Sequence, residues 1–284
     1  MKLVQARLLI IAALAAGAWS TLPIEDRQTA HQTVRWAEPE NRSIEISDVN
    51  GSIRVVGEDR QDVQMTADTI IRAATVEDVS RAKQLEGLTV TQSGAAIRVC
   101  ATPQYCGCDN GRQRHDGTRE ERYQVRVDFD LRVPKHVIVK ACSVNGGTLS
   151  VNNTDGDFDM RNVNGGVELM NVGGSGRAET VNGSLSASFA ASPQKPSAFK
   201  TVNGSVSVAL PSDLNADLKL KTVNGGLYTD FDAAPLPSAA PIRERRNGGY
   251  VYRRNRSVSV RVGRGGPELT FDGVNGDVRV LRRK

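Results

Sequence analysis

The chain has 284 residues, a formal net charge of +5 and four cysteines. This length suits one large all-β domain or two modest ones. No stretch reaches the roughly 20 apolar residues that a membrane-spanning helix needs, which excludes a chain built from such helices.

The N-terminus has the pattern of an export signal. Lys2 and Arg7 accompany a short apolar run at Leu8–Ala16, and Ala16-Gly17-Ala18 supplies the small residues that signal peptidase reads. We expect residues 1–18 to be a signal peptide; an uncleaved N-terminal anchor is the alternative. The mature chain then starts near Trp19, outside the cytoplasm, with periplasm, outer envelope and cell surface all left open.

The next segments predict a loose start followed by strands and one helix. Residues 19–42 lack clear periodicity, and we expect a loose mature N-terminus there. Ser43–Val56 alternates apolar and polar residues on both sides of Asn50-Gly51, which indicates two strands joined by a turn. Thr75 is an N-cap candidate with an acidic residue three positions on, so we expect one short helix near residues 76–85.

The four cysteines favour disulfides over a metal site. They are Cys100, Cys106, Cys108 and Cys142, in and beside a polar, glycine-containing loop at residues 101–120. Oxidising compartments allow such residues to bridge, and four cysteines allow three pairings, which the sequence leaves open. A metal site would add His115 to three of these cysteines, but Cys106 and Cys108 do not have the usual zinc spacing.

A repeated Val-Asn-Gly motif dominates the chain. Its asparagines are Asn50, Asn145, Asn164, Asn182, Asn203, Asn224 and Asn275. The central intervals, from Asn145 to Asn224, are 19, 18, 21 and 21 residues, with a second turn signal about halfway through each. Each repeat is therefore expected to contain two short strands and two turns, and a period near 20 residues is typical of stacked architectures.

Two topologies are compatible with this period. Asn-Gly favours a tight hairpin turn, and it equally suits a corner at which identical residues stack and asparagines form hydrogen-bonded ladders. An antiparallel meander needs a cover that one helix cannot provide, whereas two facing sheets cover each other. We therefore expect an all-β fold, a parallel β-solenoid or β-roll of two-strand rungs of about 18–21 residues; an antiparallel β-meander or sandwich is the alternative. In each motif we expect Val to anchor the core, Asn to serve the turn or ladder, and Gly to allow the backbone angle.

These repeats, the early element DVNGSIRVVG and the run VDFDLRVPKHVIVKACSVNGG resemble the bacterial putative-adhesin family of unknown function. That family is related to auto-transporter adhesin head domains, and its members are secreted or envelope-attached β-solenoid proteins. The resemblance covers roughly Ser43 to Arg279 and implies a single domain over residues 43–284. It supplies no catalytic residues.

Two groups of charged residues are candidate sites. Asp155, Asp157 and Asp159 recur every second residue and are a weak calcium candidate; their spacing matches no established calcium loop, and a solvated acidic face is favoured. An Arg-rich insertion at residues 232–256 is a candidate for binding an anionic partner, although a solvated face is again favoured. Its arginines are Arg243, Arg245, Arg246, Arg253, Arg254 and Arg256.

The sequence thus predicts an exported, non-enzymatic cell-envelope or surface protein of adhesin type that acts by surface contact. The expected partner is an anionic envelope glycan, a lipid surface or another protein; nucleic acid and cofactors are not expected. The rival functions are a glycan-acting β-helix enzyme, which needs clustered carboxylates, and a periplasmic envelope-stress or sensing component.

Overall fold

The computed structural model describes residues 2–3, 24–38, 40–103, 106–108, 123–237, 242–246, 249–253 and 257–283. The expected signal peptide, residues 1–18, lies outside these ranges except for Lys2–Leu3. Most of the cysteine-bearing loop at residues 101–120 lies outside them too.

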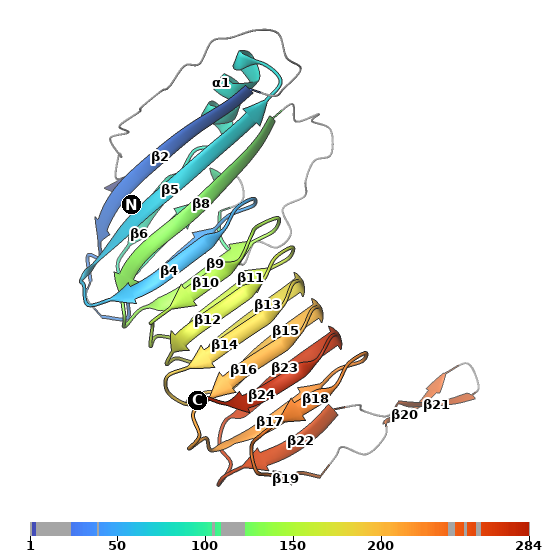
Figure 1. The fold of residues 1–284 in the computed structure, drawn as a ribbon. Helices are drawn as coiled ribbons and strands as arrows, with labels where there is room; N and C mark the ends of the chain where they lie inside the picture. Colours follow the sequence, from blue (N-terminus) through green and yellow to red (C-terminus); the bar gives the residue numbers. More distant parts are fainter. Residues whose placement is uncertain are drawn as a thin grey trace.

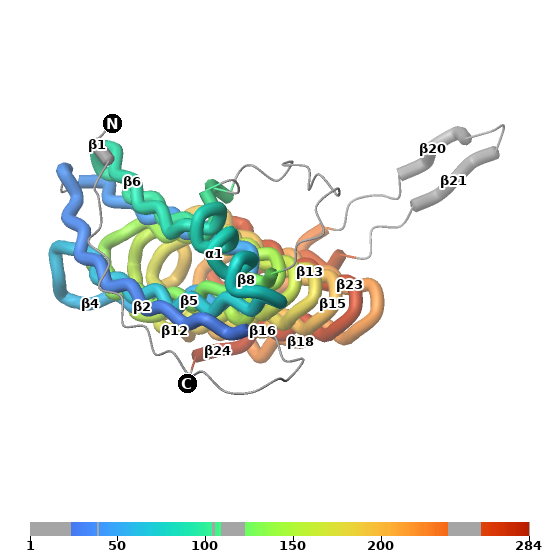
Figure 2. The backbone as a smooth tube through the Cα atoms, turned by 90° about the horizontal axis from the view of Figure 1, so that it is seen from above, coloured from blue at the N-terminus to red at the C-terminus, as the bar shows by residue number. Residues whose placement is uncertain are grey.

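The described chain is all-β with one helix, and most of it belongs to two large sheets that face each other across a common core (Figures 1 and 2). Both sheets mix parallel and antiparallel pairs. Sheet A contains, in spatial order, β1 (Lys2–Leu3), β6 (Thr89–Ser93), β7 (Ala96–Cys100), β3 (Ser43–Ser47), β9 (Ile138–Ser143), β11 (Phe158–Asn162), β13 (Gly176–Asn182), β15 (Ser197–Asn203), β23 (Glu268–Asn275), β17 (Ala216–Lys221), β22 (Ser257–Val262) and β19 (Ala233–Pro235). Sheet B contains β18 (Leu227–Thr229), β24 (Val278–Arg282), β16 (Val206–Leu210), β14 (Leu185–Phe189), β12 (Val167–Val172), β10 (Leu149–Asn152), β4 (Ile53–Glu58), β8 (Tyr123–Pro134), β5 (Asp62–Ala73) and β2 (Ile24–Arg35).

The middle of both sheets is a stack of two-strand units. Each unit places one strand in sheet A and the next strand of the chain in sheet B, as in β11–β12, β13–β14 and β15–β16. Neighbouring units pair in parallel and in the register of the repeat, so that Val167 lies opposite Leu185 and Leu185 opposite Val206. The stack explains why the sequence alternates with period two: inward residues are buried in the core and outward residues lie at the surface.

The last unit of the chain is not the last in space. β23–β24 lies between β15–β16 and β17–β18, although it follows both in the sequence. β22 then pairs antiparallel with β17 and with β19, which extends sheet A beyond the stack.

The other end of the stack is extended by antiparallel strands and the helix. α1 (Val76–Leu85) has the expected bounds, and the Thr75 side chain accepts a hydrogen bond from the backbone N–H of Asp78. The expectation of a loose segment at residues 19–42 is wrong for Ile24–Arg35, which forms β2 and pairs with β5 along its whole length. The sequence shows no apolar alternation there because the half-buried side chains of β2 are mostly polar. Asp26, for example, pairs with Lys83 of α1 at 2.9 Å.

The Val-Asn-Gly turns lie along one edge of the stack. The expected role of Val as a core anchor is wrong for Val144, Val163 and Val181, whose exposed fractions are 43%, 36% and 38%. These valines form an exposed row, because they precede the turn at a position that points away from the core.

Two structural requirements explain why the motif contains glycine. Gly51, Gly204 and Gly276 have positive φ, between 144° and 154°, as the backbone-angle interpretation requires. At Gly165 and Gly183 the reason is close approach. A Cβ built on either residue would lie 2.2 Å from a carbonyl oxygen of the neighbouring unit.

Six of the seven motif asparagines form a continuous ladder, whereas the Asn50 side chain donates to the Val125 carbonyl at 3.2 Å. From Asn224 the side-chain amides donate in sequence to Asn275, Asn203, Asn182, Asn164 and Asn145, with N···O distances of 2.7–2.8 Å. Because all five bonds run in the same direction, each polarises the next.

Removing one amide in the middle of the ladder is expected to destabilise the fold measurably. We expect Asn182→Ala to lower the free energy of unfolding by about 1 kcal/mol. Asn182→Asp should cost about 2 kcal/mol near pH 8, because a carboxylate then faces the Asn164 Oδ1 acceptor. Urea unfolding of both variants, with Asn152→Ala as a control outside the ladder, measures this. Equal stability of all three variants would show that the ladder contributes nothing.

Candidate contact surface

The outer face of sheet A carries rows of alternating charge. The strand registers place residues of opposite sign next to each other across five neighbouring strands, in a row formed by Arg98, Glu45, Lys140, Asp159 and Arg177. A second row contains Arg161, Glu179, Lys200, Asp272 and Lys221. Within these rows, Arg98 lies 2.8 Å from Glu45 and Lys221 lies 3.2 Å from Asp272. Covering this face with a partner would desolvate many charges, which is costly.

The outer face of sheet B is very different over β10, β12, β14 and β16. Twelve outward positions, on these strands and just before them, form what we call the serine face. They are Thr148, Ser150, Asn152, Gly166, Glu168, Met170, Ser184, Ser186, Ser188, Ser205, Ser207 and Ala209. Glu168 is the one charged residue among them. Small neutral side chains dominate, so this surface is flat. Removing water from it costs less free energy than removing water from a charged surface.

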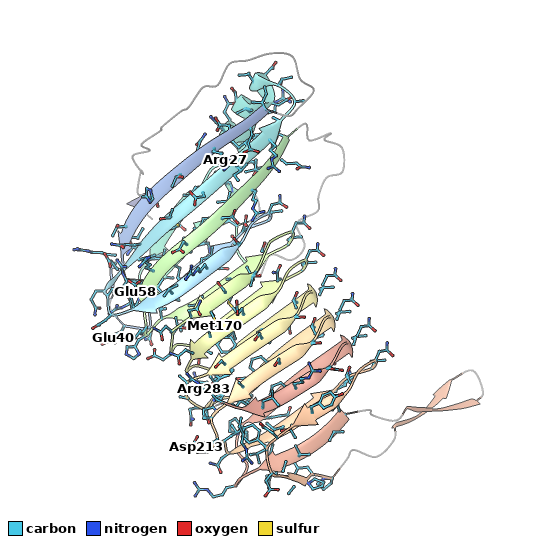
Figure 3. All side chains as sticks on the ribbon, viewed as in Figure 1. Arg27, Glu40, Glu58, Met170, Asp213 and Arg283 are labelled. Carbon is cyan, nitrogen blue, oxygen red and sulfur yellow. A yellow bond between two sulfur atoms is a disulfide. The ribbon has the colours of Figure 1, made fainter. Side chains whose placement is uncertain are left out.

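Met170 lies within the serine face, is 42% exposed and can be seen on the outer side of the sheet in Figure 3. The exposed valine row, containing Val144, Val163 and Val181, lies on the turn edge of the same units.

Charged groups flank the serine face at both ends. On the side of β4 and β8, Arg126 lies 2.8 Å from Asp128 and Arg132 lies 2.8 Å from Glu58. Partial burial of Asp128 opposes ionisation, but hydrogen bonds from Arg126 and Ser52 outweigh it and lower the pKa of this carboxyl. On the side of β24 and β18, the Arg279 guanidinium lies 5.3 Å from the centre of the Tyr228 ring. A neutral centre with a polar rim is the usual anatomy of a protein interface.

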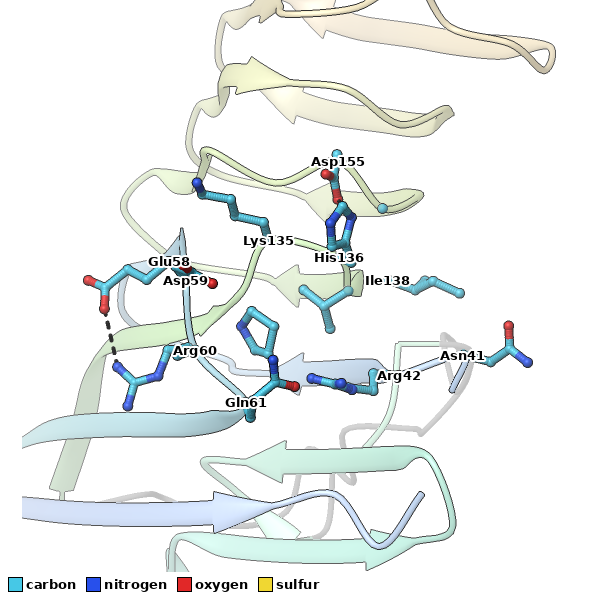
Figure 4. A pocket seen from close by; sticks show the side chains of 13 residues that line it. Asn41, Arg42, Glu58, Asp59, Arg60, Gln61, Lys135, His136, Ile138 and Asp155 are labelled. Atoms are coloured by element: carbon cyan, nitrogen blue, oxygen red, sulfur yellow. Dashed lines mark hydrogen bonds and ion pairs between the residues drawn. The ribbon is translucent and has the colours of Figure 1, made fainter. Parts of the chain in front are cut away.

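A second candidate is a polar groove of about 400 Å³ between the loop after β4 and the turn before β9 (Figure 4). Two pairs of its side chains already contact each other: His136 Nδ1 lies 2.7 Å from Asp155, and Arg60 lies 3.2 Å from Glu58. Because these groups already have partners, the groove is a weaker candidate than the serine face.

A buried polar row runs inside the turn edge. The hydroxyls of Thr180 and Thr201 each donate to a glycine carbonyl of the neighbouring unit at 2.7 Å. Asp48 occupies the equivalent position in β3–β4, beside Ser143, and its Oδ2 has no hydrogen-bond partner among the described atoms. Burial is the main cause that raises the pKa of Asp48 to about 7, with the charge of Asp128 adding to it.

The cysteines form two disulfides, Cys100–Cys106 and Cys108–Cys142, which supports the disulfide prediction. They fasten Cys106 and Cys108 to sheet A, where the Cys108 N–H donates to Glu45 at 2.7 Å. Two disulfides indicate an oxidising location, outside the cytoplasm.

The three aspartates of the calcium candidate have separate partners. Asp155 contacts His136, Asp157 lies 2.7 Å from Lys195, and Asp159 lies 2.7 Å from Arg161. Within the described ranges, no three His, Cys, Asp or Glu side chains are placed to hold a metal ion.

The Arg-rich insertion is described in part. β20 (Ile242–Arg246) and β21 (Gly249–Arg253) form an antiparallel sheet of their own, in which the backbone of Arg243 lies opposite Tyr252 and that of Arg245 opposite Tyr250. Arg254 and Arg256 lie outside the described residues.

In the parts of the chain that are described, no helix is long and apolar enough to cross a membrane.

Sequence reasoning missed the serine face and Asp48. The signal for the first was present, because Ser184-x-Ser186-x-Ser188 and Ser205-x-Ser207 place hydroxyls at successive outward positions. Aligning the repeats on Val-Asn-Gly would also have shown an aspartate where the other copies have Ser, Asn, Thr or Gly.

Comparison with known proteins gives a distant likeness. No family model matches the chain, and no curated protein matches it. One similar solved structure is a putative cell adhesion protein from Clostridium sporogenes ATCC 15579, with 9% identity over 91% of this chain and 100% of that one and a TM-score of 0.45. Another is a putative adhesin (BF0245) from Bacteroides fragilis NCTC 9343, with 8% identity over 90% and 97% of the two chains and a TM-score of 0.32. Both TM-scores are below 0.5, so we draw no functional argument from these proteins.

Proposed function

We propose that this protein is an exported, non-enzymatic adhesin-type protein of the cell envelope or surface, built as a β-solenoid, and that the serine face is its contact surface. The observation that carries the proposal is the contrast between the two outer faces. One sheet shows rows of alternating charge, and the other shows twelve outward positions with one charge. A partner that covers the serine face removes water from few charged groups, so contact there carries the smallest desolvation cost.

The chemistry of the serine face favours a flat, neutral or weakly charged partner. Its hydroxyls lie in rows about 4.8 Å apart, and they both donate and accept hydrogen bonds. A polysaccharide or a protein surface of the envelope or of a neighbouring cell has this chemistry. Four strands cover only about 300 Å², well under the ~800 Å² per partner of a stable complex. Each contact is therefore weak, and strength comes from many copies.

A lysine at the centre of the serine face is expected to abolish most of this binding. We expect Ser186→Lys to weaken binding of the purified protein to isolated envelope polysaccharide or intact cells about tenfold, since the buried ammonium loses its hydration. Thr270→Lys, which adds the same charge to the outer face of sheet A, is the matched control and should bind like the unmodified protein.

The same assay separates the alternatives. Equal binding by both lysine variants would contradict the proposed surface. If binding were lost only on charge reversal at Arg243 and Arg245, the Arg-rich insertion would be the contact site, with an anionic partner. Reproducible cleavage of the polysaccharide would support the glycan-acting enzyme instead.

A further inference from the structure

β2 is the outermost strand of sheet B (Figure 1), and among the described strands it pairs with β5 alone. The pairing runs from Ile24 to Arg35 without a register shift. The far side of this strand therefore presents a straight row of backbone N–H and C=O groups with no strand partner in the described part of the chain.

Exposed edge strands are normally protected by short length, proline, lysine or a bulge. The other described edges of sheets A and B follow this rule: β1 has two residues, β18 and β19 have three each, and β19 ends at Pro235. β2 has twelve residues, no proline and no lysine, and Gln28–Val34 carries no formal charge when His31 is neutral. It is a long edge with an uncharged centre, to which another strand can add.

We propose that β2 pairs antiparallel with β2 of a second copy of this chain, about a twofold axis through Ala30. The partner is a second copy because the strand is complementary to itself in one register. With residue i opposite residue 60 − i, Glu25 of each copy lies opposite Arg35 of the other, and both pairs have opposite charge.

Neighbouring registers are worse. Only every second residue of an edge strand points its N–H and C=O groups outward. The allowed antiparallel registers therefore differ by two residues in pairing, which moves the centre of the pair by one residue. Centring the pair on His31 sets Arg27 against Arg35 twice. Centring it on Thr29 places Arg35 beyond the end of the partner strand.

The pairing has a consequence for contact. A twofold axis perpendicular to the sheet joins the two sheets B into one continuous sheet, with both serine faces on the same side. If the serine face binds as proposed above, the dimer is bivalent and binds a repetitive surface more strongly than one copy does. The pairing itself does not depend on the proposed function.

Sedimentation velocity over a wide concentration range tests the pairing directly. We expect a reversible dimer, and we expect Thr33→Lys to raise its dissociation constant about tenfold, because the introduced ammonium of each copy then faces Arg27 of the other. Ser186→Lys is the control: it should dimerise normally while losing partner binding. A protein that stays monomeric at every concentration, or equal dimerisation of both variants, would overturn the proposal. Loss of binding by Ser186→Lys bears only on the serine face.

A cysteine substitution tests the register. Ala30 lies opposite itself, within the Cα separation of about 4.4–6.8 Å that a disulfide needs, whereas Gln28 is displaced from its own copy by four residues, about 13 Å. We expect Ala30→Cys to form a disulfide-linked dimer on mild oxidation and Gln28→Cys to remain unlinked. Linkage of both variants to the same extent, or of neither, would exclude this register.

Discussion

Asp48→Asn is expected to stabilise the protein by about 4 kcal/mol at pH 8 and to have almost no effect at pH 4. The pKa of Asp48 is raised from an ordinary 3.8 to about 7, a difference of about 3 units at about 1.4 kcal/mol each. In the folded protein this carboxyl holds its proton up to near neutral pH, whereas in the unfolded chain it ionises near pH 4. The contribution of Asp48 to stability is therefore fully present below about pH 4, falls as the pH rises and is lost above about pH 7.

The structure contains a template for the substitution. Asn162 occupies the equivalent position in another unit, where its Oδ1 accepts from the Val163 N–H at 2.9 Å and its Nδ2 donates to the carbonyls of Gly147 and Gly166. Asp48 Oδ1 already accepts from the Val49 N–H at 2.7 Å. An asparagine keeps that bond and supplies an amide donor in place of the unpartnered Oδ2.

Chemical unfolding of the original protein and of Asp48→Asn at pH 4, 6 and 8 measures the effect. Glu45 and Asp128 have lowered pKa values and change stability in the opposite direction, so the difference between the two proteins is the relevant quantity. A difference that stays constant with pH would show that Asp48 is ionised in the folded state.

Gly183→Ala is expected to cost about 3 kcal/mol, more than the ~1 kcal/mol typical of a point substitution. The new methyl group would lie 2.2 Å from the carbonyl oxygen of Gly165. That carbonyl is held in place because it accepts the Thr180 hydroxyl at 2.7 Å. The two units must therefore separate locally, which also strains the asparagine ladder.

Gly87→Ala is the matched control, because a Cβ on Gly87 meets no atom within 4 Å. We expect its thermal midpoint to remain close to that of the original protein while that of Gly183→Ala falls by several degrees. Similar midpoints for the two variants would mean that the spacing between units is not fixed by the glycines.

Much of the fold follows from patterns that are local in the sequence. The interval between asparagines sets the length of each unit, the alternation in segments such as Val206–Leu210 separates buried from exposed residues, and the Thr75 cap locates the helix. These features depend on neighbouring residues, so one sequence is enough to predict them.

The features that sequence reasoning missed depend on residues far apart in the chain. β2 is polar on both faces and forms a strand because β5 lies beside it. Nothing in the composition of β15 or β17 indicates that β23 lies between them. The serine face becomes visible only when the outward residues of four units are placed side by side, because a single repeat contains three of its twelve positions.

Oxidative footprinting of Met170 tests the central claim, that the serine face is the contact surface. Met170 is an oxidisable side chain on that face, while His136, 89% exposed at its side chain in the separate polar groove, serves as the reference. The protein is exposed to hydroxyl radicals free and bound to intact cells or envelope polysaccharide. We predict that binding protects Met170 and leaves His136 unchanged. Equal oxidation of Met170 in the free and bound protein would contradict the account.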